Sequence, residues 1–138
     1  MDDVTLQKAA IIERCLRRVR DEHAGDDARL DDITRLDAIV LNLQRACEAA
    51  IDLAMHRVRV HRLGVPQESR EAFAALAGAG LLDPGLANAM QRMVGFRNIA
   101  VHDDQALNLD IVKSVLNHLL GELERFAVDM TKASAESR

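Results

Sequence analysis

Aromatic residues are scarce in this sequence of 138 residues, which contains no tryptophan, no tyrosine and only three phenylalanines. Residues branched at Cβ also form no extended run. Strands depend on both kinds of residue, whereas alanine, leucine, arginine and the acidic residues that dominate here favour helices. The composition therefore indicates helices packed on helices, in a chain that is 49% apolar and long enough to bury a core.

Three further absences limit the possible functions. The formal net charge is -4, so the chain lacks the basic excess of proteins that grip nucleic acid along an extended surface. No apolar run is long enough to span a membrane, and the acidic start at Met1 is unlike a secretory signal. The two cysteines, Cys15 and Cys47, fall in amphipathic helical patterns and fit buried free thiols better than a disulfide. We therefore expect a cytoplasmic protein, in which any contact with nucleic acid is made by a local group of arginines.

The apolar residues that are present recur at helical spacing. They predict an all-α fold, a bundle of four to five helices with antiparallel neighbours, in one domain over residues 1–132. A polar tail, residues 133–138, is expected to fray. The expected helices cover residues 5–23, 31–61, 67–79, 84 to about 100, and 108 onward.

One segment, Gly95 to Asp104, carries side chains suited to phosphodiester chemistry. Arg97 keeps its charge at working pH and can hold a phosphate, and His102 titrates near neutrality and can move a proton. Asn98 can orient either group. The spacing alone also fits a surface ion pair for Arg97 and a favourable charge at a helix end for His102, and it does not separate the two interpretations.

The wider sequence resembles a known family. The spacing from Arg97 to His102 matches the R-x4-6-H motif of the HEPN superfamily, and the neighbouring motifs resemble its HepT branch. These motifs are Val40–Arg45, Glu48, Ile51–Ala54, Gly64–Pro66, Met93–Gly95, Arg97–His102 and Leu107–Val112.

The resemblance implies a dimeric helical bundle of HEPN type, with two R-x4-H motifs at a shared cleft. It implies metal-independent cleavage of RNA, plausibly tRNA, without a cofactor. Arg97 would then hold the scissile phosphate, His102 would act as general base or acid, and Asn98 would position one of them. The implied partner is an MntA-like nucleotidyltransferase antitoxin, in a type VII-like toxin–antitoxin pair.

One position departs from the family pattern. In the family the antitoxin adds AMP to a tyrosine two residues after the motif histidine, and here that position is Asp104. The usual modification therefore has no acceptor in this chain. The alternative to an active ribonuclease is a weak or inactive HEPN module that docks a nucleotidyltransferase. A purely structural dimeric helical protein is the remaining alternative.

Other polar groups give weaker signals. On the second helix a polar face formed by Arg45, Glu48, Asp52 and Arg59 either lines the cleft in part or is simply solvated. The cleft candidates on this helix are Asn42, Arg45 and Asp52, of which Asn42 and Arg45 lie near its middle. His118 and Glu122 have the spacing of zinc ligands on a helix, but the sequence supplies no evident third ligand, so we expect no metal site.

Overall fold

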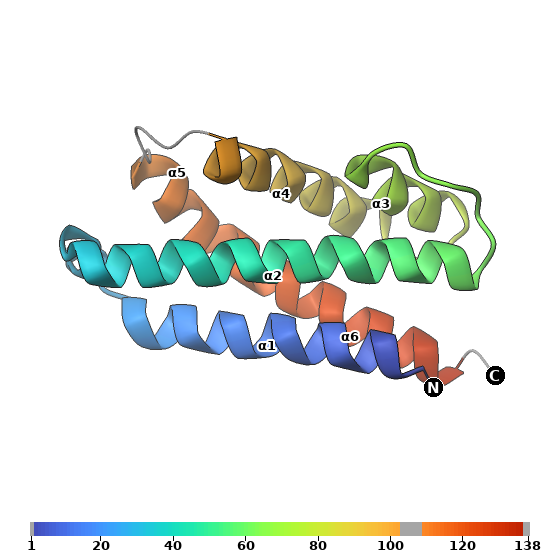
Figure 1. Ribbon diagram of the computed structural model, residues 1–138, viewed down its shortest axis with the longest axis horizontal. Helices are drawn as coiled ribbons and strands as arrows, with labels where there is room; N and C mark the ends of the chain where they lie inside the picture. The colour runs from blue at the N-terminus through green and yellow to red at the C-terminus, as the bar shows by residue number, and fades with distance from the viewer. Residues whose placement is uncertain (1, 103–108, 137–138) are drawn as a thin grey trace.

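The structure, a computed structural model, describes residues 2–102 and 109–136, and its regular elements are helices joined by short connections (Figure 1). The α-helices are α1 (Asp3–His23), α2 (Ile33–Val60), α3 (Ser69–Gly78), α4 (Pro84–His102), α5 (Leu109–Ser114) and α6 (Leu120–Glu136). A 3-10 turn covers Asp27–Asp31, and a π-helical turn covers Val115–Leu119. The all-helical bundle predicted from the sequence is confirmed, while the dimer stays a prediction.

Acidic side chains fix where two of the helices begin. The Asp32 carboxylate accepts a hydrogen bond from the amide of Thr34 at 3.0 Å, which satisfies one free N–H at the start of α2. Asp83 does the same for α4 by accepting from the Leu86 amide at 3.0 Å. Pro84 is the first residue of α4, where its missing N–H costs nothing. The helix start predicted at residue 84 is confirmed.

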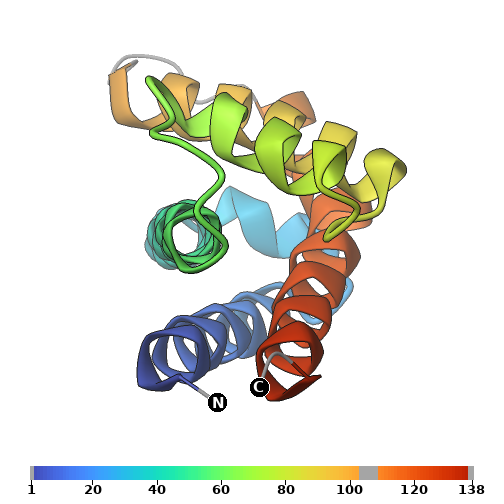
Figure 2. The same ribbon diagram turned by 90° about the vertical axis from the view of Figure 1, so that its right-hand side faces the viewer.

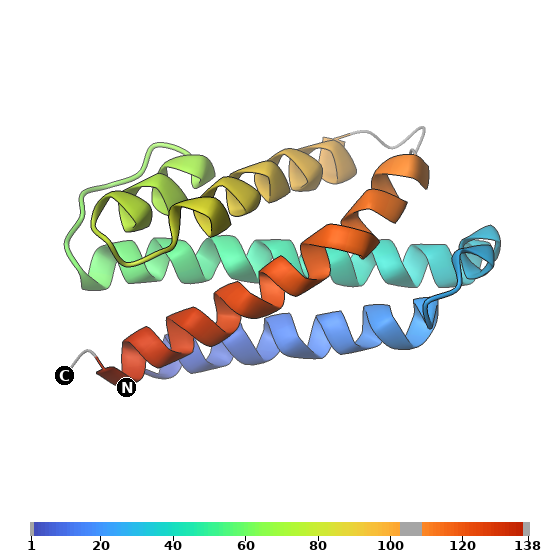
Figure 3. The same cartoon turned by 180° about the vertical axis from the view of Figure 1, so that it is seen from behind.

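The last part of the chain is one long bent helix. Ser114 and Leu120, on either side of the π-helical turn, both have right-handed helical backbone angles, so α5 continues into α6. Figure 3, the view from behind, shows this helix crossing in front of α2 and α1. The sequence analysis placed the start of this helix at residue 108, which lies outside the described residues. Among the described helices, none has the length and apolarity that a membrane crossing would need.

The core lies where the long helices cross. In Figure 1, α1 and α2 run antiparallel beside each other, and α3 and α4 cover the opposite side of α2. The view along the bundle places α6 against α1 and below α3 and α4 (Figure 2). Phe73 of α3 and Phe126 of α6 are both fully buried and meet edge to face, with ring centroids 5.5 Å apart. Such a pair contributes about 0.5–1.5 kcal/mol beyond its buried area, so it helps to fasten α3 to α6.

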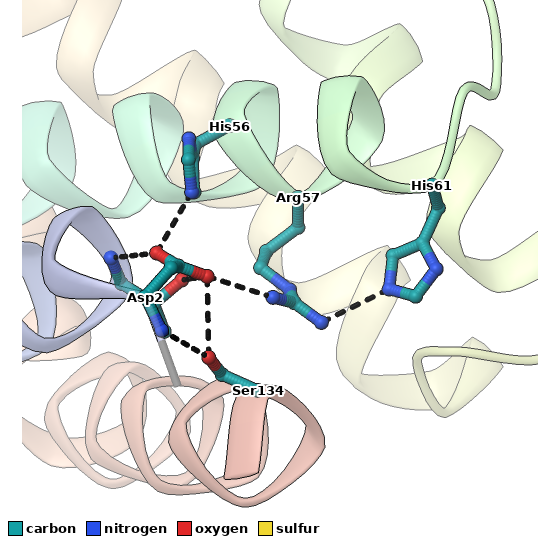
Figure 4. Close-up of polar contacts among 6 residues, drawn as sticks. Asp2, His56, Arg57, His61 and Ser134 are labelled. Atoms are coloured by element: carbon teal, nitrogen blue, oxygen red, sulfur yellow. Dashed lines mark hydrogen bonds and ion pairs between the residues drawn. The ribbon is translucent and has the colours of Figure 1, made fainter. Parts of the chain in front are cut away.

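The two ends of the chain meet in a polar cluster (Figure 4). The Asp2 carboxylate, which caps α1, accepts hydrogen bonds from His56, from Arg57 and from the Ser134 hydroxyl, at 2.8, 3.2 and 3.2 Å. Arg57 in turn contacts His61 at 2.9 Å. The sequence analysis expected residues 133–138 to fray, but α6 extends through residue 136 and Ser134 is buried. The reason is that Asp2, far away in sequence, gives this serine a polar partner.

Candidate active site

Arg97 lies in α4 with its guanidinium held between two other helices. Its Nη1 forms an ion pair with Glu48 Oε1 of α2 at 3.2 Å. Its Nη2 donates a hydrogen bond to the hydroxyl of Ser69, the first residue of α3, at 3.3 Å. The Arg97 side chain is 22% exposed and that of Glu48 is 47% exposed, so the pair sits at the edge of the core. Three helices therefore converge on one guanidinium.

Close packing of α3 on α4 brings Ser69 to this position. Arg70 Nε donates to the Gln91 carbonyl at 3.3 Å, and Gln91 Nε2 donates back to the Arg70 carbonyl at 3.2 Å. Arg70 Nη2 lies 3.2 Å from where a Cβ on Gly95 would be, so a larger residue would force this arginine to move. The glycine in the Met93–Gly95 motif thus leaves room for the end of the Arg70 side chain beside α4.

A small pocket of about 160 Å³ adjoins the guanidinium. Arg97 and Asn98 line it together with Ser69, as do Glu68, Arg70 and Val94. Within the part of the chain that the structure describes, Arg97 Nε is buried and has no hydrogen-bond partner. An unpaired buried donor is costly, so this N–H is a local defect in hydrogen bonding that the described residues do not repair.

The charges of Glu48 and Arg97 also act on a buried thiol next to the site, that of Cys47. Burial raises the pKa of the Cys47 thiol to about 12, and the neighbouring Glu48 charge adds to this increase while Arg97 opposes it. Cys15 is also buried, and burial raises the pKa of its thiol. Both cysteines are free, as the sequence predicted. Neither thiol is suited to act as a nucleophile.

The remaining motif residues are only partly placed. His102 is the last residue of α4, but its side chain lies outside the described residues, and Asp104 lies outside them entirely. The structure therefore brings Arg97 and Asn98 together at one pocket and leaves the position of the histidine ring to prediction.

The three cleft candidates on α2 have different surroundings. Arg45 and Asp52 line a groove of about 410 Å³ between α1 and α2, where Asp52 forms an ion pair with Lys8 at 3.1 Å. Asn42 is buried, and its amide donates to the Ala38 carbonyl of its own helix at 2.8 Å, so it does not line that groove. Glu48 lines this groove and also forms the ion pair with Arg97, so it lies between the groove and the candidate active site.

The sequence analysis did not assign Glu48 or Ser69 to the site. One feature of the sequence could have indicated Glu48: it shares the polar face of α2 with Arg45 and Asp52 at helical spacing. Ser69 had none, since its contact with Arg97 depends on how α3 packs on α4.

The described residues offer no evident metal site. No three histidine, cysteine, aspartate or glutamate side chains come together there in a way that would bind a metal ion. Glu122, considered with His118 from its spacing, lies 3.9 Å from Arg92 as an ion pair in a groove between α4 and the last helix.

The chain matches known proteins over nearly its full length. Residues 10–130 match the family described as Ribonuclease HepT-like. The mRNA nuclease HepT of Shewanella oneidensis is 45% identical over 133 residues, covering 96% of this chain and 99% of that protein. Two solved structures superpose with a TM-score of 0.88 at 46% identity, again covering 96% of this chain and 99% of theirs. One is a tri-AMPylated HEPN toxin of Shewanella oneidensis in complex with an MNT antitoxin, and the other is a toxin–antitoxin complex with AMP-PNP. The resemblance found in the sequence is confirmed: this chain belongs to the HepT-like ribonuclease family and is an all-helical endoribonuclease of HEPN type.

Proposed function

We propose that this chain is the toxin of a toxin–antitoxin pair and cuts RNA without a metal ion, using Arg97, Asn98 and His102. The observation that carries the proposal is the guanidinium of Arg97, which is held by Glu48 and Ser69 beside a small polar pocket. A permanently charged group fixed in this way is suited to a phosphodiester. It lies on the helix that ends at His102.

The chemistry follows from the residue types. The RNA 2′-hydroxyl attacks the adjacent phosphorus, and His102 accepts the proton that this hydroxyl loses. Arg97 stabilises the charge that develops on the phosphate oxygens, and Asn98 orients the phosphate or the histidine. The leaving 5′-oxygen takes up a proton. The products are a 2′,3′-cyclic phosphate and a 5′-hydroxyl end, so a 2′-deoxy residue at the cut site should prevent cleavage.

Helix geometry supports a homodimer. At about 3.6 residues per turn and about 1.5 Å rise per residue, Arg97 and His102 lie about 140° apart around α4 and about 7.5 Å apart along it. Positions five residues apart on a helix do not share one face, so we infer that the arginine and the histidine that act on one phosphate come from two copies of the chain. Two proton transfers also need two titrating groups, and a second copy would supply the second histidine. Closed two-fold dimers are the commonest assemblies, and light scattering at micromolar concentration should give twice the mass of the chain.

The solved relatives suggest the partner. One of the two complexes contains an MNT antitoxin, and the other is a toxin–antitoxin complex with AMP-PNP. We therefore assign to this chain an MntA-like nucleotidyltransferase partner. We also propose a cytoplasmic location, because both this partner and the RNA substrate would be found there. Asp104 favours a second candidate function, a weak or inactive HEPN module that docks the partner, because it replaces the tyrosine of the family and puts a negative charge near His102.

One assay separates the two functions. Purified protein is incubated with total tRNA and, separately, with an mRNA, both in the presence of excess chelator. The first reaction tests whether tRNA is the substrate, as the family resemblance implies. The second tests mRNA, the substrate for which the Shewanella relative is named. The chain as written should cleave RNA in the chelator, while Arg97→Ala and His102→Ala should not. If the chain as written is inactive and Asp104→Tyr cleaves, the docking module is the correct description.

A further inference from the structure

We propose that Glu48 is a positioning residue of this active site, which holds the Arg97 guanidinium in the orientation that binds the scissile phosphate, with Ser69 as a second anchor. The inference rests on the proposed function, but its central test does not require RNA cleavage. Glu48 lies outside the R-x4-H segment, on another helix.

The two anchors act on different nitrogens. Glu48 binds Nη1 at 3.2 Å from α2, and Ser69 binds Nη2 at 3.3 Å from α3. Because the guanidinium is a rigid plane, contacts at two of its nitrogens from two directions fix both its position and its tilt. A single contact would leave the plane free to rotate.

The remaining donors leave room for a ligand. The guanidinium has five N–H donors, and the two contacts use two of them. Nη1 and Nη2 each carry a second N–H beyond the one used in these contacts, and Arg97 lines a pocket together with Asn98. A phosphate can therefore bind to Arg97 while Glu48 stays in place, so the two contacts need not compete.

The degree of burial shows why this pair matters more than a surface ion pair. Ion pairs between fully exposed side chains are weak, because both chains move and water screens the charges. The Arg97 side chain is only 22% exposed, and the charges of Glu48 and Arg97 both act on the thiol of the buried Cys47. The carboxylate thus fixes Arg97 before substrate arrives, which removes an ordering cost from the reaction.

The first measurement is made on the RNA-free protein. In ¹H–¹⁵N NMR spectra, the Nε–H signal of Arg97 is assigned by its loss in Arg97→Lys. In the wild-type chain this signal should be sharp and protected from exchange with water. Glu48→Gln keeps the size of the side chain but removes its charge, and it should broaden the signal or speed its exchange. Glu124→Gln is the matched control, because Glu124 forms an exposed pair with Arg20 at 2.7 Å between two other helices; it should leave the signal unchanged.

The second measurement is steady-state cleavage of RNA, which gives kcat and KM. A misplacement of about 1 Å can cost about 10²-fold in rate, so Glu48→Gln should lower kcat by about 10²-fold and change KM little. Glu48→Asp, which keeps the charge, should restore part of this loss. Ser69→Ala should lower kcat by a smaller factor, since it removes a neutral partner. Circular dichroism and Tm should stay close to those of the wild type, because Glu48 is half exposed.

The outcomes are distinct. A Glu48→Gln variant with an unchanged Arg97 signal and an unchanged kcat would overturn the proposal and leave the contact as an ordinary ion pair. A faster variant would also overturn it, because Glu48 would then compete with the phosphate. If Glu48→Gln fails to fold, the Arg97 signal is measured in Ser69→Ala instead. An unchanged signal in that variant would then contradict the proposal. If the wild type cuts no RNA but its Arg97 signal responds to Glu48→Gln as expected, the proposed function fails while the positioning role stands.

Discussion

The carboxylate of Asp2 accepts a hydrogen bond from the guanidinium of Arg57 at 3.2 Å, across 55 positions of sequence. Asp2 also caps α1, and the Arg57 side chain is only 2% exposed (Figure 4). One residue near the N-terminus thus caps the start of α1 and pairs with a buried charge.

Replacing Asp2 should therefore destabilise the fold. Asp2→Asn keeps a side chain able to cap the helix but removes the negative charge beside Arg57. Breaking a buried ion pair costs about 3–5 kcal/mol, and because Asp2 is partly exposed we expect a loss of about 2–3 kcal/mol in the free energy of unfolding. Urea denaturation measures this loss. Asp3→Asn, an exposed change in the same turn, is the control and should stay within about 0.5 kcal/mol.

The same contacts predict acid sensitivity. Burial tends to raise the pKa of Asp2, but hydrogen bonds from Thr5 and from His56, and the charge of His56, outweigh it and hold this pKa well below its ordinary value of 3.8. The unfolded chain therefore takes up the proton more readily than the folded protein. The stabilisation is present in full above about pH 5 and is lost progressively as the pH falls below the ordinary value. Between pH 6 and pH 3 the stability of Asp2→Asn should fall less than that of the wild type, and parallel curves would contradict this prediction.

Arg97 and His102 should act as a unit. Loss of a positioned proton-transfer group costs about 10²–10⁴ in rate, and loss of one charge-stabilising donor costs about 10²–10³. In the double variant Arg97→Ala/His102→Ala, the rate should fall no further than in the worse single variant, because neither residue has a role without the other. Fully additive losses would indicate two independent functions.

Asp104 should prevent the family's usual AMP addition. Incubation of this chain with a cognate nucleotidyltransferase and ATP should add no AMP at this position, since a carboxylate has replaced the tyrosine hydroxyl. Asp104→Tyr should gain the mass of AMP there, as peptide mass spectrometry would show. Efficient modification of the chain as written would mean that another hydroxyl group is the acceptor.

The cysteines should be unreactive in the folded protein. Thiol reagents attack the thiolate, and burial raises the pKa of Cys47 to about 12 and also raises that of Cys15. At pH 8, iodoacetamide should label neither cysteine in native protein and both in urea. Rapid labelling of Cys47 alone would show that the site region opens in solution.

The sequence by itself determined the features that depend on neighbours along the chain. Apolar spacing gave the helices, and an acidic residue before Pro84 marked the start of α4, because capping and helical hydrogen bonds span only three or four residues. The motif from Arg97 to His102, with the neighbouring motifs, was enough to indicate the family.

Tertiary structure alone decided which side chains meet at the site. Arg97 of α4 contacts Ser69 of α3, which is 28 positions away in sequence, and Glu48 of α2. Neither contact follows from the spacing of residues within one helix. Asn42 and Arg45 were both cleft candidates near the middle of the second helix, yet Asn42 is buried and Arg45 is exposed. Helical periodicity fixes the direction in which a residue points from its own axis, but the angle and depth at which helices pack decide what it meets there.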